Sequence, residues 1–123
     1  MVKRVRGSRT GRPIMVLLDL LGRRWTLRIL WELREAPLRF RELQGLIGAS
    51  PTIVNTRLAE LRAARLVELD EATGYRLTAL GGELLQLLLP LHVWSEKWAS
   101  LYPRPFAASA SPTRRAGSPR GRR

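Results

Sequence analysis

The sequence contains no cysteine and only one histidine, His92, among its 123 residues. Without thiols the chain has no disulfides, thiolate metal sites or cysteine nucleophiles, and one imidazole leaves little for metal binding or a catalytic triad. Glycine-rich phosphate loops and paired-carboxylate sites are missing as well. We therefore expect a protein that is not an enzyme and that holds no metal or cofactor.

Long apolar runs are also lacking, which bears on where the protein works. The longest stretch, residues 84–94, has about eleven residues and includes a glutamine, a proline and a histidine. Because a membrane span needs about 20 residues, we expect no membrane contact. The basic N-terminus lacks the pattern of a signal peptide. We expect a soluble cytoplasmic protein, associated with the nucleoid if it binds DNA.

Acidic residues are scarce, at 10 against 22 lysines and arginines, and the excess positive charge lies at the two ends of the chain. Residues 1–13 carry five bases and residues 103–123 carry six, both without an acid, whereas the middle is nearly neutral. These ends are rich in Gly, Ser, Pro and Arg, so we predict disordered tails at 1–12 and 103–123 around one domain at 13–102. Such tails attract polyanions without reading sequence, although an arginine-rich codon bias would give the same composition.

Hydrophobic periodicity and helix-boundary residues predict a mainly α fold with a small β hairpin. In chain order the expected elements are helices at 13–21 and about 25–35, an extended link at 38–40, helices at 41–47 and 51–64, strands at 66–69 and 75–77, and a helix from 79 to about 100. Ser50 and Pro51 are predicted to cap and open the 51–64 helix, and Thr78 to cap the last one. Pro90 should kink that helix. A short helix, a glycine turn, an amphipathic helix and a hairpin predict a winged helix-turn-helix.

The 51–64 helix has one apolar side and one small, polar side. Val54, Leu58 and Leu61 share the apolar side, which we expect to be buried. The opposite side carries no acid and consists of Thr52, Thr56, Ala59 and Ala63, with Asn55 on its flank. Little bulk and several hydroxyl or amide groups are what a helix needs in the major groove, where Asn can pair with adenine. An ordinary solvated face would more often carry Glu and Lys.

Arginines surround this helix in the sequence. Arg39 and Arg41 precede the first helix of the motif, where backbone contacts usually fall. Arg57 lies on the rim of the 51–64 helix, the predicted recognition helix, and either clamps a phosphate or pairs with Glu60. Together with the helix they predict DNA contacts, which we assign to Arg39, Arg41, Ser50, Pro51, Thr52, Asn55, Thr56, Arg57, Arg62 and Arg76.

The last helix carries more large apolar residues than a small core can cover. Exposed apolar stripes usually mark an interface, and the first helix is apolar too. We therefore predict a homodimer through the terminal helices, since a two-fold protein suits a two-fold operator. The expected interface residues are Ile14, Leu17, Leu88, Leu91, Trp94 and Trp98.

At this point the sequence resembles the bacterial HxlR-type winged-helix regulators, within the MarR-like superfamily. Residues 18–30, LDLLGRRWTLRIL, are similar to that family's LDLIGGKWTLLIL, and residues 37–43, PLRFREL, to its PLRFNEL. Residues 50–61, SPTIVNTRLAEL, are similar to SPKxLTxRLxxL, while Leu77-Thr78 and the Trp94–Trp98 pair match further positions. The resemblance implies a dimeric DNA-binding regulator of transcription whose hairpin is the wing.

The sequence departs from the family pattern at several positions. Arg12 stands where many members have cysteine, so sensing through a thiol is not available, and any small-molecule effector stays unidentified. The wing is acidic, with Asp70 and Glu71 against Arg76. Arg65 replaces a glycine that often closes the recognition helix; a left-handed arginine there costs on the order of 1 kcal/mol.

Two further interpretations stay open beside the operator-binding dimer. The scaffold would serve as a protein-interaction module if the acidic wing repels DNA. Alternatively, the chain would bind nucleic acid through its tails alone and show no preference between operator and random duplex.

Overall fold

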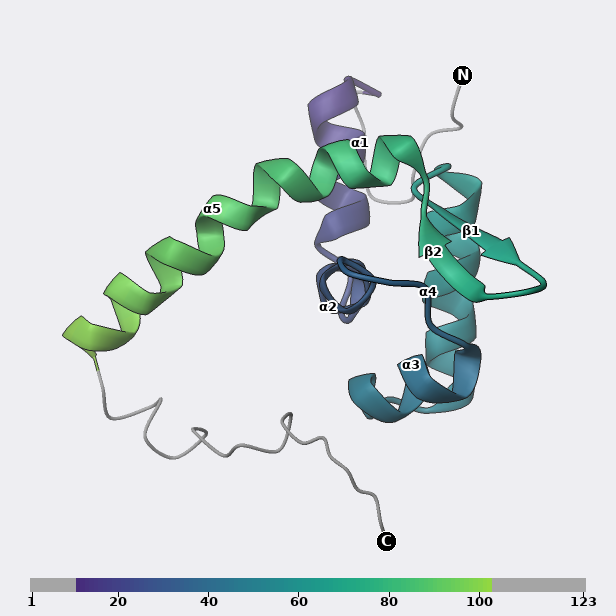
Figure 1. Ribbon diagram of the computed structural model, residues 1–123. Helices are drawn as coiled ribbons and strands as arrows, with labels where there is room; N and C mark the ends of the chain where they lie inside the picture. Colours follow the sequence, from purple (N-terminus) through teal and green to yellow (C-terminus); the bar gives the residue numbers. More distant parts are fainter. Residues whose placement is uncertain (1–10, 103–123) are drawn as a thin grey trace, which may run out of the picture. The chain divides into compact units, whose positions relative to one another are not determined.

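The computed structural model describes residues 11–102, which form five helices and one two-stranded hairpin (Figure 1). The elements are α1 (Pro13–Leu21), α2 (Thr26–Glu32), α3 (Phe40–Ile47), α4 (Pro51–Ala63), β1 (Val67–Asp70), β2 (Gly74–Leu77) and α5 (Ala79–Leu101). This is the mainly α, winged helix-turn-helix architecture that the sequence predicts. The described chain divides into two compact units between Leu85 and Gln86, and the predicted tails lie outside the described residues apart from Gly11 and Arg12.

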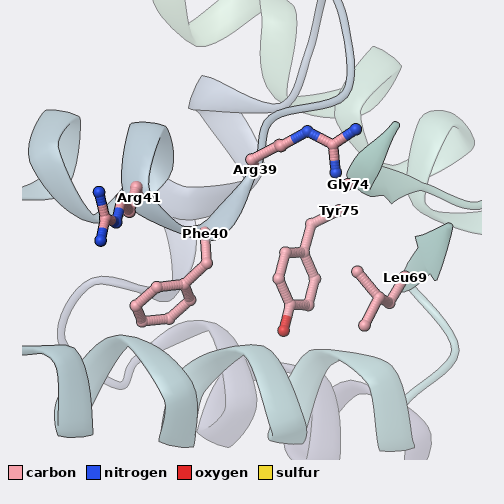
Figure 2. Close-up of a pocket in the computed structure, with 6 residues that line it drawn as sticks. All are labelled: Arg39, Phe40, Arg41, Leu69, Gly74 and Tyr75. Atoms are coloured by element: carbon pink, nitrogen blue, oxygen red, sulfur yellow. The ribbon is translucent and has the colours of Figure 1, made fainter. Parts of the chain in front are cut away.

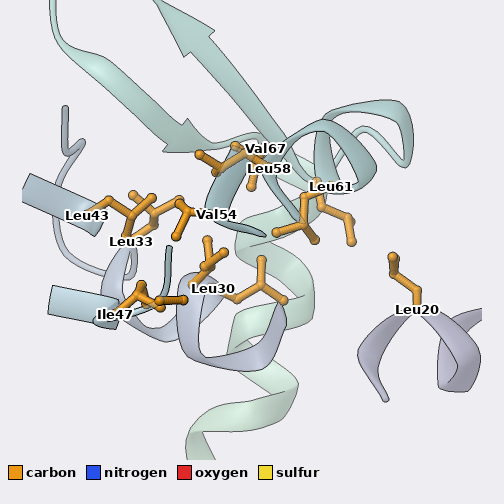
Figure 3. Close-up of a cluster of buried hydrophobic side chains, with 12 residues drawn as sticks. Leu20, Leu30, Leu33, Leu43, Ile47, Val54, Leu58, Leu61 and Val67 are labelled. Carbon is orange, nitrogen blue, oxygen red and sulfur yellow. The ribbon is translucent and has the colours of Figure 1, made fainter. Parts of the chain in front are cut away.

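The core of the first unit gathers one side of each helix of the helix-turn-helix (Figure 3). Val54, Leu58 and Leu61 of α4 are buried, as the periodicity predicts. Leu43 and Ile47 of α3 are buried too, one turn apart on one stripe. The other members of this core are Leu20, Ile29, Leu30, Leu33, Ala49, Leu66 and Val67.

The helices before α4 differ in detail from a simple periodic pattern. Leu46 of α3 is 37% exposed because it lies at the edge of the stripe that Leu43 and Ile47 define. The second helix ends at Glu32 rather than near residue 35, since Leu33 already leaves the helical conformation. Its N-cap, Trp25, is left-handed with φ 81°, a strained conformation that the sequence did not predict.

The start of α4 is built as expected for a helix-turn-helix. Gly48 takes φ 82° at the end of α3, which favours glycine. The Ser50 hydroxyl then accepts a hydrogen bond from the Ile53 amide at 3.2 Å, and Pro51 opens the helix. This short turn fixes the position of α4 against α3 within the first unit.

The hairpin is antiparallel, and Leu38 adds a single bridge to it. Val67 pairs with Leu77 and Asp70 with Gly74 at the two ends of the ladder. Leu38 and Tyr75 exchange backbone hydrogen bonds of 2.9 and 2.8 Å, which confirms the extended conformation at Leu38. The predicted link ends one residue early, because Phe40 already begins α3. Gly74 has φ 109°, and a Cβ there would lie 2.5 Å from the Leu38 carbonyl oxygen.

A compact junction connects the end of α4 to the beginning of α5. Arg65 is left-handed with φ 66°, so it carries the backbone strain anticipated for a residue at this helix end. Its carbonyl accepts the Thr78 hydroxyl at 2.7 Å, and the Leu66 carbonyl accepts the Thr78 amide at 3.1 Å. Thr78 in turn caps α5, because its Oγ1 accepts the Gly81 amide at 3.0 Å. The helix runs on through Pro90.

Two adjacent glycines of α5 give a matched test of this junction. A Cβ on Gly81 would lie 2.1 Å from the Leu66 carbonyl oxygen, whereas one on Gly82 meets nothing within 4 Å. We predict that Gly81→Ala lowers the free energy of unfolding, because backbone must move. Gly82→Ala should instead raise it by roughly 1 kcal/mol through helix propensity. Urea unfolding of both variants measures the difference, and equal effects would contradict the close packing described here.

Candidate nucleic-acid interface

The exposed side of α4 is the predicted reading face. Thr52, Asn55, Thr56, Ala59 and Ala63 are all exposed, and this face carries small or uncharged side chains. The Thr56 hydroxyl donates to the Thr52 carbonyl at 2.9 Å, which leaves its oxygen free to accept. The Asn55 amide makes no side-chain hydrogen bond to any other residue in the described range, so both its donor and its acceptor face solvent.

One flank of this face continues into an exposed cation. At about 100° per residue, Arg62 lies on the same side of the helix as Asn55, two turns further along. Its side chain is exposed and has no ion pair within residues 11–102. Asn55 and Arg62 therefore present an amide and a guanidinium along one edge of the reading face.

The other flank is occupied by a network of charges. The Arg57 Nε donates to the Arg24 carbonyl at 2.8 Å, and Arg57 Nη1 lies 3.3 Å from Glu60 Oε1. Glu60 Oε2 also pairs with Arg23 Nη1 at 3.0 Å. Of the two roles considered for Arg57, the structure places the side chain on Glu60. Spacing along α4 could not reveal the contacts with Arg23 and Arg24, which lie more than thirty residues earlier in the chain.

The start of α3 and the hairpin enclose a hollow of about 390 Å³ (Figure 2). Phe40, Tyr75 and Leu69 extend to the same side and give it apolar walls. Arg39 and Arg41 flank it, with their guanidinium groups at opposite ends. Apolar walls between two cations are suited to a sugar ring that lies between two phosphates.

The two arginines of this hollow are held differently. Arg39 donates from its backbone amide to Glu42 Oε1 at 2.9 Å and from its guanidinium to the Ala72 carbonyl in the wing. It therefore ties α3 to the hairpin. Arg41 is exposed and makes no ion pair with another described residue, so its guanidinium is available to a phosphate.

Arg76, the single base of the wing, is paired within the wing. Its Nε lies 2.7 Å from Glu68 Oε2 and its Nη1 lies 3.3 Å from Asp70 Oδ2. Asp70 Oδ1 accepts the Ala72 and Thr73 amides at 2.7 and 3.2 Å, which shapes the turn. These two backbone donors, aided by Arg76, hold the pKa of the Asp70 carboxyl below its ordinary value.

The expected interface residues are largely accessible. In α1, Ile14 is 53% exposed and Leu17 is half-buried. In the second unit, Leu91, Trp94 and Trp98 are exposed and Leu88 is half-buried. The Trp94 and Trp98 rings stack with centroids 5.7 Å apart. Exposed apolar surface of this kind is typical of interaction sites.

Neither a membrane-spanning helix nor a metal-binding cluster occurs in the described part of the chain. No helix between residues 11 and 102 is long and apolar enough to cross a bilayer. Over the same range, no three His, Asp or Glu side chains come together in a group that could hold a metal ion.

Comparisons with known proteins identify helix-turn-helix regulators. A family model described as HxlR-like helix-turn-helix matches residues 20–102. The HTH-type transcriptional regulator sll1512 of Synechocystis sp. is 29% identical over 93 residues, which span 70% of this chain and 69% of that protein.

Solved structures point the same way. Quinone-bound YodB from B. subtilis superposes with a TM-score of 0.64 at 29% identity, covering 70% of this chain and 97% of that one. A possible HxlR family transcriptional factor from Thermoplasma volcanium gives 0.63 at 29% identity, with 76% and 95% covered. A regulator described as MarR family from Enterococcus faecalis gives 0.62 at 26% identity, with 83% and 99% covered. These are winged-helix regulators, which confirms the fold class.

The Asp70 turn makes a pH-dependent prediction. Because the folded-state pKa of Asp70 lies below its unfolded value, its stabilising contribution is present above the unfolded pKa and is lost as pH falls through the folded one. In Arg76→Gln, the NMR titration midpoint of Asp70 should rise but stay below its ordinary value, since the backbone donors from Ala72 and Thr73 remain. A midpoint that returned to the ordinary value would show that the charge of Arg76 is the main cause.

Proposed function

The chain belongs to the HxlR-like helix-turn-helix family of transcriptional regulators, and we propose that it works by binding a pseudo-palindromic operator in double-stranded DNA as a homodimer. The observation that carries the proposal is the exposed side of α4, which is small, polar and free of acids. A helix with such a face enters the major groove without steric or electrostatic conflict. Its core side is fixed by Val54, Leu58 and Leu61, so the reading face is presented rigidly.

Sequence preference comes from Asn55 in this proposal. Its amide has no competing side-chain hydrogen bond in the described chain, and a bidentate contact to adenine is worth about 1–3 kcal/mol against the wrong base. Thr52 and Thr56 add hydroxyl groups on the same face, able to meet phosphate or a thymine methyl group. Together they read a short half-site.

Contacts with the DNA backbone fix the position of α4 along the operator in this proposal. Ser50 caps α4 and Pro51 opens it. In this proposal the N-terminus of α4 faces the DNA, where its backbone N–H groups attract phosphate. Arg41 and Arg62, which have no ion pair within residues 11–102, supply cations in the helix-turn-helix. Arg39 holds the hollow between α3 and the wing in shape, and we place the sugar–phosphate backbone there. Arg57 and Arg76 would first have to leave the acids that bind them, so we give them no primary contact.

The homodimer follows from the exposed apolar residues of α1 and α5. Two copies joined through Ile14, Leu17, Leu88, Leu91, Trp94 and Trp98 would cover this surface and present two recognition helices to one operator. The two stacked tryptophans form a compact anchor of the type that carries most of the energy in interfaces.

A small-molecule effector is a further part of the proposal. YodB from B. subtilis is known in a quinone-bound form, so one structural relative binds a quinone. The present sequence has no cysteine, so an effector of this chain would bind without a thiol adduct. Its site and identity are open to direct ligand screening.

Substitution of Asn55 tests the reading role. We predict that Asn55→Ala lowers the ratio of operator to random-duplex affinity by roughly tenfold, because one bidentate contact is lost. Removal of residues 114–123 should instead weaken binding to both duplexes and flatten the salt dependence. Fluorescence anisotropy of both variants separates the two effects. An unchanged ratio in Asn55→Ala would rule out this readout, and loss of all binding with the tail would favour the sequence-neutral binder.

Substitution of Trp94 tests the dimer. We predict that Trp94→Ala raises the dimer dissociation constant by about 30-fold, the effect of losing an interface anchor of about 2 kcal/mol. Lys97→Ala, an exposed change in the same stretch of α5, is the matched control and should leave it unchanged. Sedimentation velocity gives both values, and a wild-type chain that sediments as a monomer at micromolar concentration would contradict the proposal.

A further inference from the structure

Glu60 is the single acidic residue of the recognition helix, and it lies at the edge of the reading face. At about 100° per residue it falls between the exposed threonine side of α4 and the rim where Arg57 sits. A carboxylate at this position faces the region where DNA phosphates would come closest to that flank. Its presence therefore needs an explanation in a protein whose reading face is otherwise free of acids.

The contacts of Glu60 show what it holds. One carboxylate oxygen lies 3.0 Å from Arg23 Nη1, and the other lies 3.3 Å from Arg57 Nη1. Two guanidinium groups, one from the turn between α1 and α2 and one from α4, thus share one carboxylate. Arg57 is fixed further by the bond from its Nε to the Arg24 carbonyl at 2.8 Å.

The network is partly sheltered from solvent. The side chains of Arg23, Arg57 and Glu60 are 25%, 21% and 26% exposed, so their ion pairs are less screened than those of fully exposed groups. A phosphate that approached either arginine would also meet the Glu60 carboxylate. The negative charges of the phosphate and the carboxylate repel each other, so the pairing withholds both guanidinium groups from the DNA backbone.

Two further cations beside the reading face would strengthen binding to every duplex alike. Phosphate contacts carry no sequence information, and a regulator is useful in proportion to its preference for the operator over competing DNA. We propose that Glu60 is a specificity-determining residue, which lowers sequence-independent affinity by sequestering Arg23 and Arg57. The inference rests on the proposed DNA-binding function.

The test compares Glu60→Gln with Glu83→Gln in the full-length chain. Both remove one negative charge, but Glu83 is exposed on α5 and has no ion pair among residues 11–102. The measured quantity is the slope of log affinity against log salt for an operator and a random duplex. Each new phosphate contact steepens this slope by about 0.9. We expect Glu60→Gln to steepen it by about 1–2 relative to Glu83→Gln and to lower the operator preference several-fold.

A second pair of variants keeps the test independent of stability. Arg23→Gln should leave the slope of the wild type unchanged, because its guanidinium is withheld there. In the double variant, Arg23→Gln added to Glu60→Gln should make the slope shallower than in Glu60→Gln alone by about 0.9, the value of one phosphate contact. Circular dichroism confirms that each variant is folded before binding is measured.

The outcomes separate this inference from the proposed function. Equal salt-dependence slopes in Glu60→Gln and Glu83→Gln would overturn the specificity role. A shallower slope in Glu60→Gln would overturn it as well, because it would mean that Glu60 orients the arginines onto phosphate. A slope that falls in Arg23→Gln alone would overturn it too. If the wild type showed no preference for the operator, the proposed function itself would fail.

Discussion

Burial of one side of α4 is the constraint on which the rest of the structure depends. Val54, Leu58 and Leu61 are essentially inaccessible, and they pack against α2 and α3 in a single core. Because an α-helix has a fixed twist, this burial decides which residues face outward. The reading face, its Asn55 and Arg62 flank and its Glu60 flank all follow from the burial of these three residues.

The arginines of the described chain fall into two groups, those without an acidic partner and those paired with one. The arginines of the helix-turn-helix are either unpaired in the described range, as Arg41 and Arg62 are, or held by an acid, as Arg57 is. The wing follows the second pattern, since Glu68 and Asp70 bind Arg76. Cations are thus concentrated near the helix-turn-helix itself, and the wing contributes shape through the bond from Arg39 to Ala72.

Local signals were enough to predict most of the fold. The cap at Ser50, Pro51 at the first position of α4 and the buried stripe came directly from residue type and spacing. The strained Trp25 and the early end of α2 did not, because tertiary contacts decide them. The Glu60 network was only half visible: Arg57 lies three residues away on one helix, whereas Arg23 reaches Glu60 across the fold. Long-range partners of this kind leave no periodic trace in a single sequence.

If the folded domain reads sequence, the chain must prefer particular DNA, and one binding experiment measures that preference. Fluorescence anisotropy would compare the full chain on the intergenic DNA upstream of its own gene with a shuffled duplex of the same composition, over a salt series. The account predicts a preference for the intergenic DNA that persists at physiological salt, where tail contacts are weakened. Equal affinities that fall together as salt rises would contradict it.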